Sequence, residues 1–178
     1  MEESPIRYRP LSVSVVTLAL GGAEAATGEL MIVERAGDLL QDDAQALVNP
    51  VNTVGVMGKG LALQFKRAHP ENFEAYAKAC AEKRVRPAEV FPVPVEAGRW
   101  ILNFPTKRHW RSSSRLEDIE AGLDDLVRLS GELGLVTIAV PPLGCGHGGL
   151  PWPTVRSLIN EKLGELNAEI RLYPPEPR

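Results

Sequence analysis

Three short stretches of the sequence combine polar side chains and turn-forming residues in patterns that suit chemistry on a ligand. The first, residues 46–65, runs from an apolar segment through two amides to three glycines, Gly55, Gly58 and Gly60. Glycine permits a positive φ and lets a ligand approach the backbone closely. A strand, a glycine loop and a helix start in this order present free backbone N–H groups to an anion. The stretch therefore predicts an anion-binding loop, with an unliganded strand-to-helix turn as the alternative.

A second glycine-rich loop lies at residues 141–150, Pro-Pro-Leu-Gly-Cys-Gly-His-Gly-Gly-Leu. It also follows an apolar stretch, at 136–140, and also precedes a predicted helix. Two such loops at the carboxyl ends of strands can hold a diphosphate from both sides, in the crevice where open α/β sheets bind ligands. The pair of loops favours ligand binding over a plain turn.

The third stretch, at 103–111, carries basic and aromatic side chains after a predicted strand. Lys107 is followed by Arg108, and a nearby cation favours the neutral, nucleophilic form of an amine. Whether Arg108 points towards Lys107 is left open by the sequence, and a solvated basic loop is the plainer interpretation. Basic residues interleaved with an aromatic ring can also pair with phosphates and stack on an unpaired base. The residues predicted to contact nucleic acid are Arg108, Trp110, Arg111 and Arg115.

The hydrophobic pattern indicates which elements position these stretches. Strands are predicted at 30–34, 46–48, 90–95, 100–104, 136–140 and 169–173. Helices are predicted from Leu61 onwards and over 71–83, 114–133 and 155–166. Prolines at 92 and 94 place their strand at an edge of the sheet. Strands that alternate with helices indicate an α/β fold with a mixed, largely parallel sheet.

The helix predicted over 114–133 has the clearest pattern in the chain. Ser114 and Glu117 have the spacing of a capping box. Apolar residues form one stripe along the helix, and Gly134 is expected to end it. In the helix before it, Cys80 is expected to be a small buried apolar residue.

Composition limits the classes of protein that the chain can belong to. Its 178 residues and 44% hydrophobic content fit one globular domain with a sizeable core. A net charge of −3 excludes general polyanion binding through bulk charge, so a nucleic-acid contact needs a local patch. Two cysteines give no disulfide framework, and three histidines without Cys-x-x-Cys argue against a structural zinc site. No apolar run reaches the length of a membrane span.

The N-terminal residues have a faint signal-peptide pattern. An apolar run at 11–20 follows two arginines, but Glu2, Glu3 and the polar residues within the run oppose that interpretation. A strand or a remnant of a neighbouring domain fits better, and we expect a cytoplasmic protein. The expected organisation is an N-terminal extension of unknown role at 1–29, a folded domain at 30–173 and a tail at 174–178.

Together the three stretches resemble a known family. Residues 46–62, 103–110 and 141–152 resemble ADP-ribose-binding macrodomains, and they look most similar to the DarG-type group of DNA ADP-ribosyl glycohydrolases, which are antitoxins related to terminal ADP-ribose protein glycohydrolase. The resemblance covers about residues 30–166, with three motifs in the family's order and spacing. It implies a three-layer α/β/α fold, ADP-ribose as the ligand, and neither cofactor nor metal. It also implies hydrolysis at C1″ of the distal ribose.

The resemblance implies roles for single residues. Lys107 matches the family's catalytic lysine, which can attack C1″, open the ribose to a Schiff base, or stabilise charge and assist proton transfer. Asp38 would accept a hydrogen bond from the adenine amino group, or alternatively cap a turn. Asn52, more than Asn49, matches the contact with the distal ribose, and Asn49 could instead bond the local backbone. The residues predicted to contact ADP-ribose are Asp38, Leu39, Asn49, Asn52, Met57, Gly58, Lys59, Gly60, Thr106, Gly144, Cys145, Gly146, His147, Gly148 and Gly149.

The second glycine loop departs from the pattern of the protein-directed relatives, which carry an acidic residue where this chain has Gly148. This difference favours a modified base of single-stranded DNA as the substrate. His147 is a candidate substitute acid or base, with a loop residue that transfers no proton as the alternative. Cys145 would need a base nearby to act as a nucleophile, so a place in the ligand cradle suits it better.

Four functions follow from the resemblance. The first is a hydrolase that removes ADP-ribose from DNA bases, as the antitoxin to a DNA ADP-ribosyltransferase toxin. The second is a hydrolase of protein-linked ADP-ribose, and the third is a module that only binds ADP-ribose. The fourth is a domain that binds the toxin directly and neutralises it sterically.

Overall fold

A computed structural model describes residues 31–177, so the predicted extension at 1–29 lies outside the described part of the chain. The strands are β1 (Ile32–Glu34), β2 (Ala46–Asn52), β3 (Phe91–Val95), β4 (Arg99–Lys107), β5 (Thr137–Val140) and β6 (Glu169–Leu172). The helices are α1 (Gly60–Ala68), α2 (Pro70–Ala81), α3 (Leu116–Leu133) and α4 (Trp152–Leu163), with short 3-10 turns at Leu39–Gln41 and Glu96–Gly98.

The six strands form one sheet in the order β1-β6-β5-β2-β4-β3. All neighbouring strands are parallel except β3, which runs antiparallel to β4. The expected mixed, largely parallel sheet is therefore confirmed, and β3, which carries Pro92 and Pro94, does lie at an edge. Because β5, β2 and β4 are adjacent and parallel, their carboxyl ends meet at one end of the sheet.

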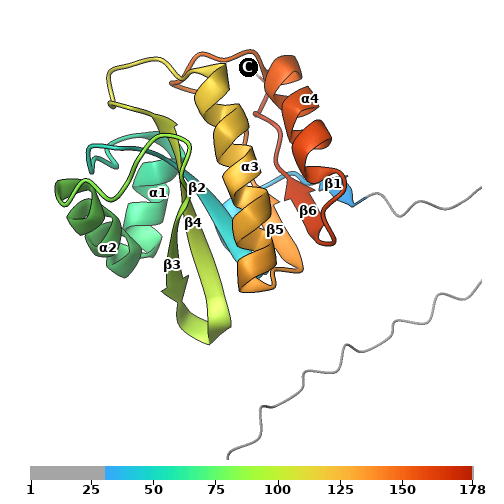
Figure 1. The fold of residues 1–178 in the computed structure, drawn as a ribbon, viewed down its shortest axis with the longest axis horizontal. Coiled ribbons are helices and arrows are strands. Elements are labelled where there is room, and N and C mark those ends of the chain that lie inside the picture. The colour runs from blue at the N-terminus through green and yellow to red at the C-terminus, as the bar shows by residue number, and fades with distance from the viewer. Residues whose placement is uncertain (1–30, 178) are drawn as a thin grey trace, which may run out of the picture.

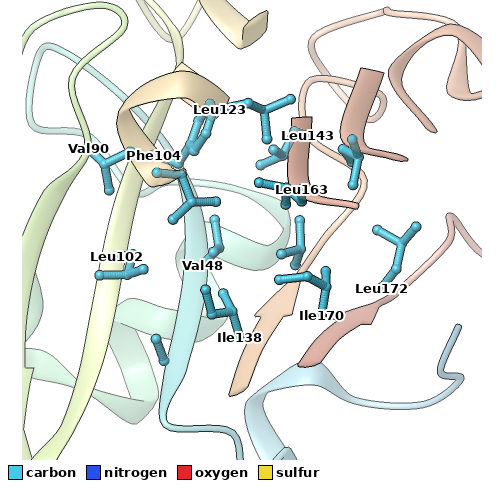
Figure 2. Close-up of a cluster of buried hydrophobic side chains, with 14 of the residues drawn as sticks. Val48, Val90, Leu102, Phe104, Leu123, Ile138, Leu143, Leu163, Ile170 and Leu172 are labelled. Carbon is cyan, nitrogen blue, oxygen red and sulfur yellow. The ribbon is translucent and has the colours of Figure 1, made fainter. Parts of the chain in front are cut away.

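Helices cover both faces of this sheet, as the three-layer expectation requires. Figure 1 shows α1 and α2 on one side and α3 and α4 on the other. Neighbouring residues of β2 face opposite layers, because Val48 packs in the core beneath α3 and α4 while Leu47 packs with Phe65 of α1. Figure 2 shows the first of these cores, in which Phe104 of β4 and Leu123 of α3 take part. Burial on both faces explains why the central strands read as continuous apolar runs.

Several boundaries differ from the sequence prediction, for example α4, which begins at Trp152 and not at 155, and three of the differences concern the site. Strand β2 continues to Asn52, beyond the predicted end at Val48, so Asn49 lies inside the strand. Strand β4 extends to Lys107, which places that lysine at the strand end itself. The capping box at Ser114 is wrong, because Arg115 is the N-cap residue of α3 and makes no side-chain cap bond. Gly134 does end α3, in the left-handed conformation with φ +62°.

No helix among residues 31–177 is both long and apolar enough to cross a membrane. The same residues contain no group of three or more histidine, cysteine, aspartate or glutamate side chains that could hold a metal ion.

Candidate active site

The two glycine loops leave neighbouring strands towards opposite faces of the sheet. The first glycine loop, residues 53–59, joins β2 to α1, and the second glycine loop, residues 141–151, joins β5 to α4. Strands β2 and β5 are adjacent and parallel. From β2 the chain continues to one edge of the sheet and from β5 to the other, so the two loops leave at the point where the strand order reverses. Open α/β sheets bind their ligands in the crevice at such a point.

Lys107 lies where the two loops come together. Its ammonium Nζ donates to the backbone carbonyl of His147, at 2.8 Å, from the end of the neighbouring strand β4. At the start of α1, a Cβ atom on Gly60 would lie 3.7 Å from Cδ2 of His147. The structure therefore brings together three of the predicted features: the catalytic lysine, the start of the first helix and His147.

The surroundings of Lys107 favour the neutral amine. Partial burial, followed by the positive charge of Lys59, lowers the pKa of Lys107 below the usual lysine value. Arg108 plays no part in this shift, because its guanidinium is turned to Asp118 and donates to both carboxylate oxygens at 3.0 Å. The cation that assists Lys107 is thus supplied by the first glycine loop and not by the next residue in sequence.

The first glycine loop is built around the buried amide of Asn52. Its Oδ1 accepts from the backbone N–H groups of Val54 at 3.0 Å and Val56 at 3.3 Å, and its Nδ2 donates to the Val56 carbonyl at 2.7 Å. The hydroxyl of Tyr76, from α2, lies 2.7 Å from the Asn52 carbonyl. Asn52 therefore supports the loop from within, and a ribose contact by its side chain stays a prediction.

Asn49 has an internal role, and the ribose contact predicted for it stays a prediction. It is fully buried, and its Nδ2 donates to Oδ1 of Asn103 at 3.0 Å. Asn103 in turn bonds Asn72 of α2, at 2.8 and 3.2 Å, so three amides link β2, β4 and α2. The side chains of three other predicted contacts, Leu39, Met57 and Thr106, are buried as well. Leu39 nevertheless lines the pocket described below, and the ligand contacts of all three residues stay predictions.

The second glycine loop is closed by its own backbone and by Ser114. The Gly148 carbonyl accepts from the Ser114 N–H, and the Gly144 carbonyl accepts from the Leu150 N–H, both at 3.0 Å. A Cβ atom on Gly148 would lie 2.2 Å from Ser114 Oγ and 2.3 Å from the Gly144 carbonyl oxygen. No side chain fits there, so the carboxylate of the protein-directed relatives has no room in this loop.

Two other residues of this loop can now be assigned. Burial raises the pKa of the Cys145 thiol to about 11, so the thiol is protonated at neutral pH and unsuited to nucleophilic attack. His147 is exposed, with its ring beside Gly60. Its predicted role in proton transfer stays a prediction.

A pocket of about 410 Å³ opens beside the start of the second glycine loop. Its walls include Leu61 of α1, Pro141 and Tyr173, and Asp38 lies at its edge. One carboxylate oxygen of Asp38 accepts from the Leu40 N–H at 3.0 Å, which is the turn cap considered as an alternative. A carboxylate has a second oxygen, so the cap leaves an acceptor for a ligand. The pocket is also lined by Pro174, Pro175 and Glu176, which the sequence prediction had left in a tail.

A neighbouring hollow of about 580 Å³ contains an ion-pair network and lies away from Lys107. Arg171 donates there to Asp42 and to Glu169, each at 2.6 Å, and the Tyr173 hydroxyl donates to Asp42 at 2.6 Å. The two bonds to Asp42 join β6 and the residue after it to the segment before β2. We assign this hollow a structural role.

The basic loop after β4 exposes an aromatic surface. Trp110 is 43% exposed, the His109 ring stacks on it with centroids 5.4 Å apart, and the Arg111 guanidinium lies 4.3 Å from its centroid. Arg108, predicted to contact nucleic acid, is instead paired with Asp118. Arg115 is the N-cap residue of α3. Trp110, Arg111 and Arg115 are exposed, and nucleic-acid contact by any of the four residues stays a prediction.

Known proteins are similar to this chain in sequence and in fold. The Macro domain family matches residues 48–159. A DNA ADP-ribosyl glycohydrolase of Thermus aquaticus is 53% identical over 143 residues, which is 78% of this chain and 40% of that relative. A DNA ADP-ribosyl transferase–DNA ADP-ribosyl glycohydrolase fusion protein of Thermosipho africanus is 36% identical over 167 residues, covering 84% and 42%. The solved macrodomain of Mycobacterium tuberculosis DarG is 48% identical with a TM-score of 0.80, over 82% of this chain and 99% of that one.

These similarities coincide with the site. The family match includes both glycine loops and Lys107. The chain nevertheless spans only about two fifths of the length of the curated relatives, so the likeness concerns one part of each of those proteins.

Proposed function

The chain belongs to the Macro domain family, and on that premise we propose that it removes ADP-ribose from DNA bases by hydrolysis. One observation carries the proposal: a lysine with a lowered pKa lies between two glycine loops, 2.8 Å from the carbonyl of the second. A relative that is 53% identical is named DNA ADP-ribosyl glycohydrolase, which supports the same activity here.

The geometry suggests how ADP-ribose lies in the crevice. The N-terminus of α1 has no side-chain cap, so its backbone N–H groups are suited to a diphosphate held between the two loops. The adenine then occupies the pocket beside Asp38, with the second carboxylate oxygen accepting from its amino group. With the adenine at the Asp38 end of the crevice, the distal ribose reaches Lys107 at the opposite end.

In the reaction, the bond from C1″ to the base nitrogen breaks and a bond from C1″ to a water oxygen forms. The leaving nitrogen gains a proton, and the water loses one. Lys107 acts at C1″ by direct attack, by opening the ribose to a Schiff base, or by stabilising charge and assisting proton transfer; in the first two cases water then breaks the bond to the lysine nitrogen. His147, whose backbone carbonyl accepts from Lys107, is the candidate for moving a proton.

Packing in the second glycine loop supports DNA over protein as the substrate. Gly148 has no room for the carboxylate of the protein-directed relatives. The exposed Trp110 and its neighbour Arg111 suit an unpaired base and a phosphate. Single-stranded DNA is therefore the proposed partner.

The same proposal gives the protein a biological setting. The Thermosipho africanus relative is named as a fusion of a DNA ADP-ribosyl transferase with a DNA ADP-ribosyl glycohydrolase. We propose that this chain likewise reverses the modification made by a cognate transferase, as its antitoxin, in the cytoplasm. The reaction needs water and no cofactor.

The substrate class can be tested with two modified substrates and the wild-type protein. One is a single-stranded oligonucleotide with ADP-ribose on a base, and the other is a protein with ADP-ribose on glutamate. We expect a mobility shift of the oligonucleotide on a denaturing gel and no release from the protein. Release from the protein alone would transfer the proposal to the protein-directed group. No release from either, with ADP-ribose still bound in a calorimeter, would leave a binding module.

A further inference from the structure

Two exposed valines beside Lys107 have no part in the ADP-ribose contacts proposed above. Val54 is 45% exposed and Val56 is 40% exposed, and both belong to the first glycine loop. Only three other large apolar side chains are exposed among residues 31–177, and one of these, Trp110, belongs to the basic loop after β4. Three of the five exposed large apolar side chains therefore belong to the two loops that start beside Lys107.

The valines and Trp110 lie on two loops that are joined beside Lys107. Asn52 and Lys107 are partners in the register of β2 and β4, so both loops start at the same level. One residue further, the Thr53 hydroxyl donates to the Arg108 carbonyl at 2.7 Å and ties the loops together. We call Val54 and Val56 the valine rim. It begins two residues after Asn52, the register partner of Lys107.

The valine rim is held in place before any partner binds. The backbone groups of both valines bond the buried amide of Asn52, while their side chains remain exposed. Between them Gly55, with φ +81°, packs towards Cys80 and Ala77 of α2. A surface that is already ordered loses little conformational entropy on binding, so apolar contact there translates into affinity.

Charge identifies the kind of partner. Lys59 and Arg111 lie on the same two loops, and the positive charge of Arg108 is already neutralised by Asp118. The chain as a whole has a net charge of −3, so these cations form a local basic patch on an acidic protein. An apolar rim beside free cations suits a partner with flat apolar groups joined by negative charges, which is an unpaired strand of nucleotides.

We propose that the valine rim contacts the nucleobase that carries ADP-ribose. This inference rests on the proposed function, because hydrolysis requires C1″ to reach Lys107. The base attached to C1″ then projects from the crevice next to Lys107, over the joined loops that carry the valines and Trp110. The valine methyl groups pack on the base there and hold it while the bond to C1″ breaks.

The test replaces the rim by a polar surface of the same shape. In the double variant Val54→Thr/Val56→Thr, two methyl groups become hydroxyls, and the exposed positions allow the fold to be kept. Loss of apolar contact for about two methyl groups predicts a decrease in kcat/KM for the modified oligonucleotide on the order of tenfold. The dissociation constant for free ADP-ribose and the melting temperature should stay at their wild-type values. Val136→Thr, at an exposed valine before β5, is the matched control and should change nothing.

Salt dependence separates contact with a base from contact with a phosphate. The rim variant should keep the wild-type slope of log KM against log salt concentration, whereas Arg111→Ala should reduce that slope. An unchanged kcat/KM in the rim variant, in a protein that does release ADP-ribose from DNA, would overturn the inference and leave the proposed function intact. No release by the wild type would reject the proposed function and this inference with it.

Discussion

At the scale of single residues, catalysis in this account depends on the protonation state of Lys107. Its pKa is lowered first by burial and then by Lys59, and both effects disfavour the charged ammonium. A lowered pKa leaves a larger fraction of the amine neutral near physiological pH than an ordinary lysine would have. Under the proposed function the first glycine loop therefore has two tasks: it faces the ligand, and its Lys59 lowers the pKa of Lys107.

This arrangement predicts the pH dependence of hydrolysis. If the neutral amine is the active form, the single-turnover rate constant rises with pH as the pH passes through the lowered pKa of Lys107, and then levels off. In Lys59→Gln the neighbouring charge is gone, so the pKa of Lys107 increases and the rising limb moves to higher pH. The measurement is single-turnover release from the modified oligonucleotide at saturating protein, across pH. Lys78→Gln, on the exposed face of α2, serves as the control. A rate constant that falls over the same range would identify the ammonium as the active form and contradict the account.

At the scale of elements, helix α2 supports the first glycine loop from the interior of the protein. The Tyr76 hydroxyl, fully buried, reaches the backbone carbonyl of Asn52, and Asn52 holds the loop through Val54 and Val56. The loop thus receives its conformation from Asn52 at the end of β2 and from Tyr76 of α2, which lie 24 residues apart in the chain. Ligand affinity should depend on this support.

Tyr76→Phe removes one hydroxyl and keeps the ring. It leaves the Asn52 carbonyl without its buried partner, which should lower the free energy of unfolding by roughly 1–3 kcal/mol. The loop also becomes less ordered, so ADP-ribose should bind more weakly. Chemical denaturation gives the first quantity and calorimetry the second. Wild-type values for both would show that Tyr76 does not support the loop.

The elements also show which features can be predicted from the sequence. The glycine loops, Lys107 and the edge strand are local patterns, and the structure contains them where they were expected. The partners of Asn49 and of Ser114 lie on other elements, 54 and 34 residues away, and no local pattern specifies them. The local pattern at Ser114 therefore predicts a capping box, whereas its N–H closes the second glycine loop. Likewise, the walls of the pocket beside Asp38 come from four distant segments, one of which had been taken for a tail.

At the scale of the whole molecule, the order of the strands produces the site. Placing β2 between β5 and β4 brings the two loops and Lys107 to one end of the sheet, while α1 and α4 depart to opposite faces (Figure 1). Lys59, Lys107 and Arg111 are positively charged residues at this end, although the net charge of the chain is −3. An acidic protein can therefore take a modified DNA strand at one end without binding nucleic acid in general.

The central claim is that Lys107 makes this domain a hydrolase of DNA-linked ADP-ribose. The most direct measurement is the single-turnover rate constant for release of ADP-ribose from a modified single-stranded oligonucleotide. It is compared between the wild type, Lys107→Ala and the exposed-lysine control Lys78→Ala, with ADP-ribose affinity measured in parallel. We expect Lys107→Ala to lower the rate constant by at least about a hundredfold and still to bind ADP-ribose, and Lys78→Ala to match the wild type. Release by Lys107→Ala at the wild-type rate would contradict the claim.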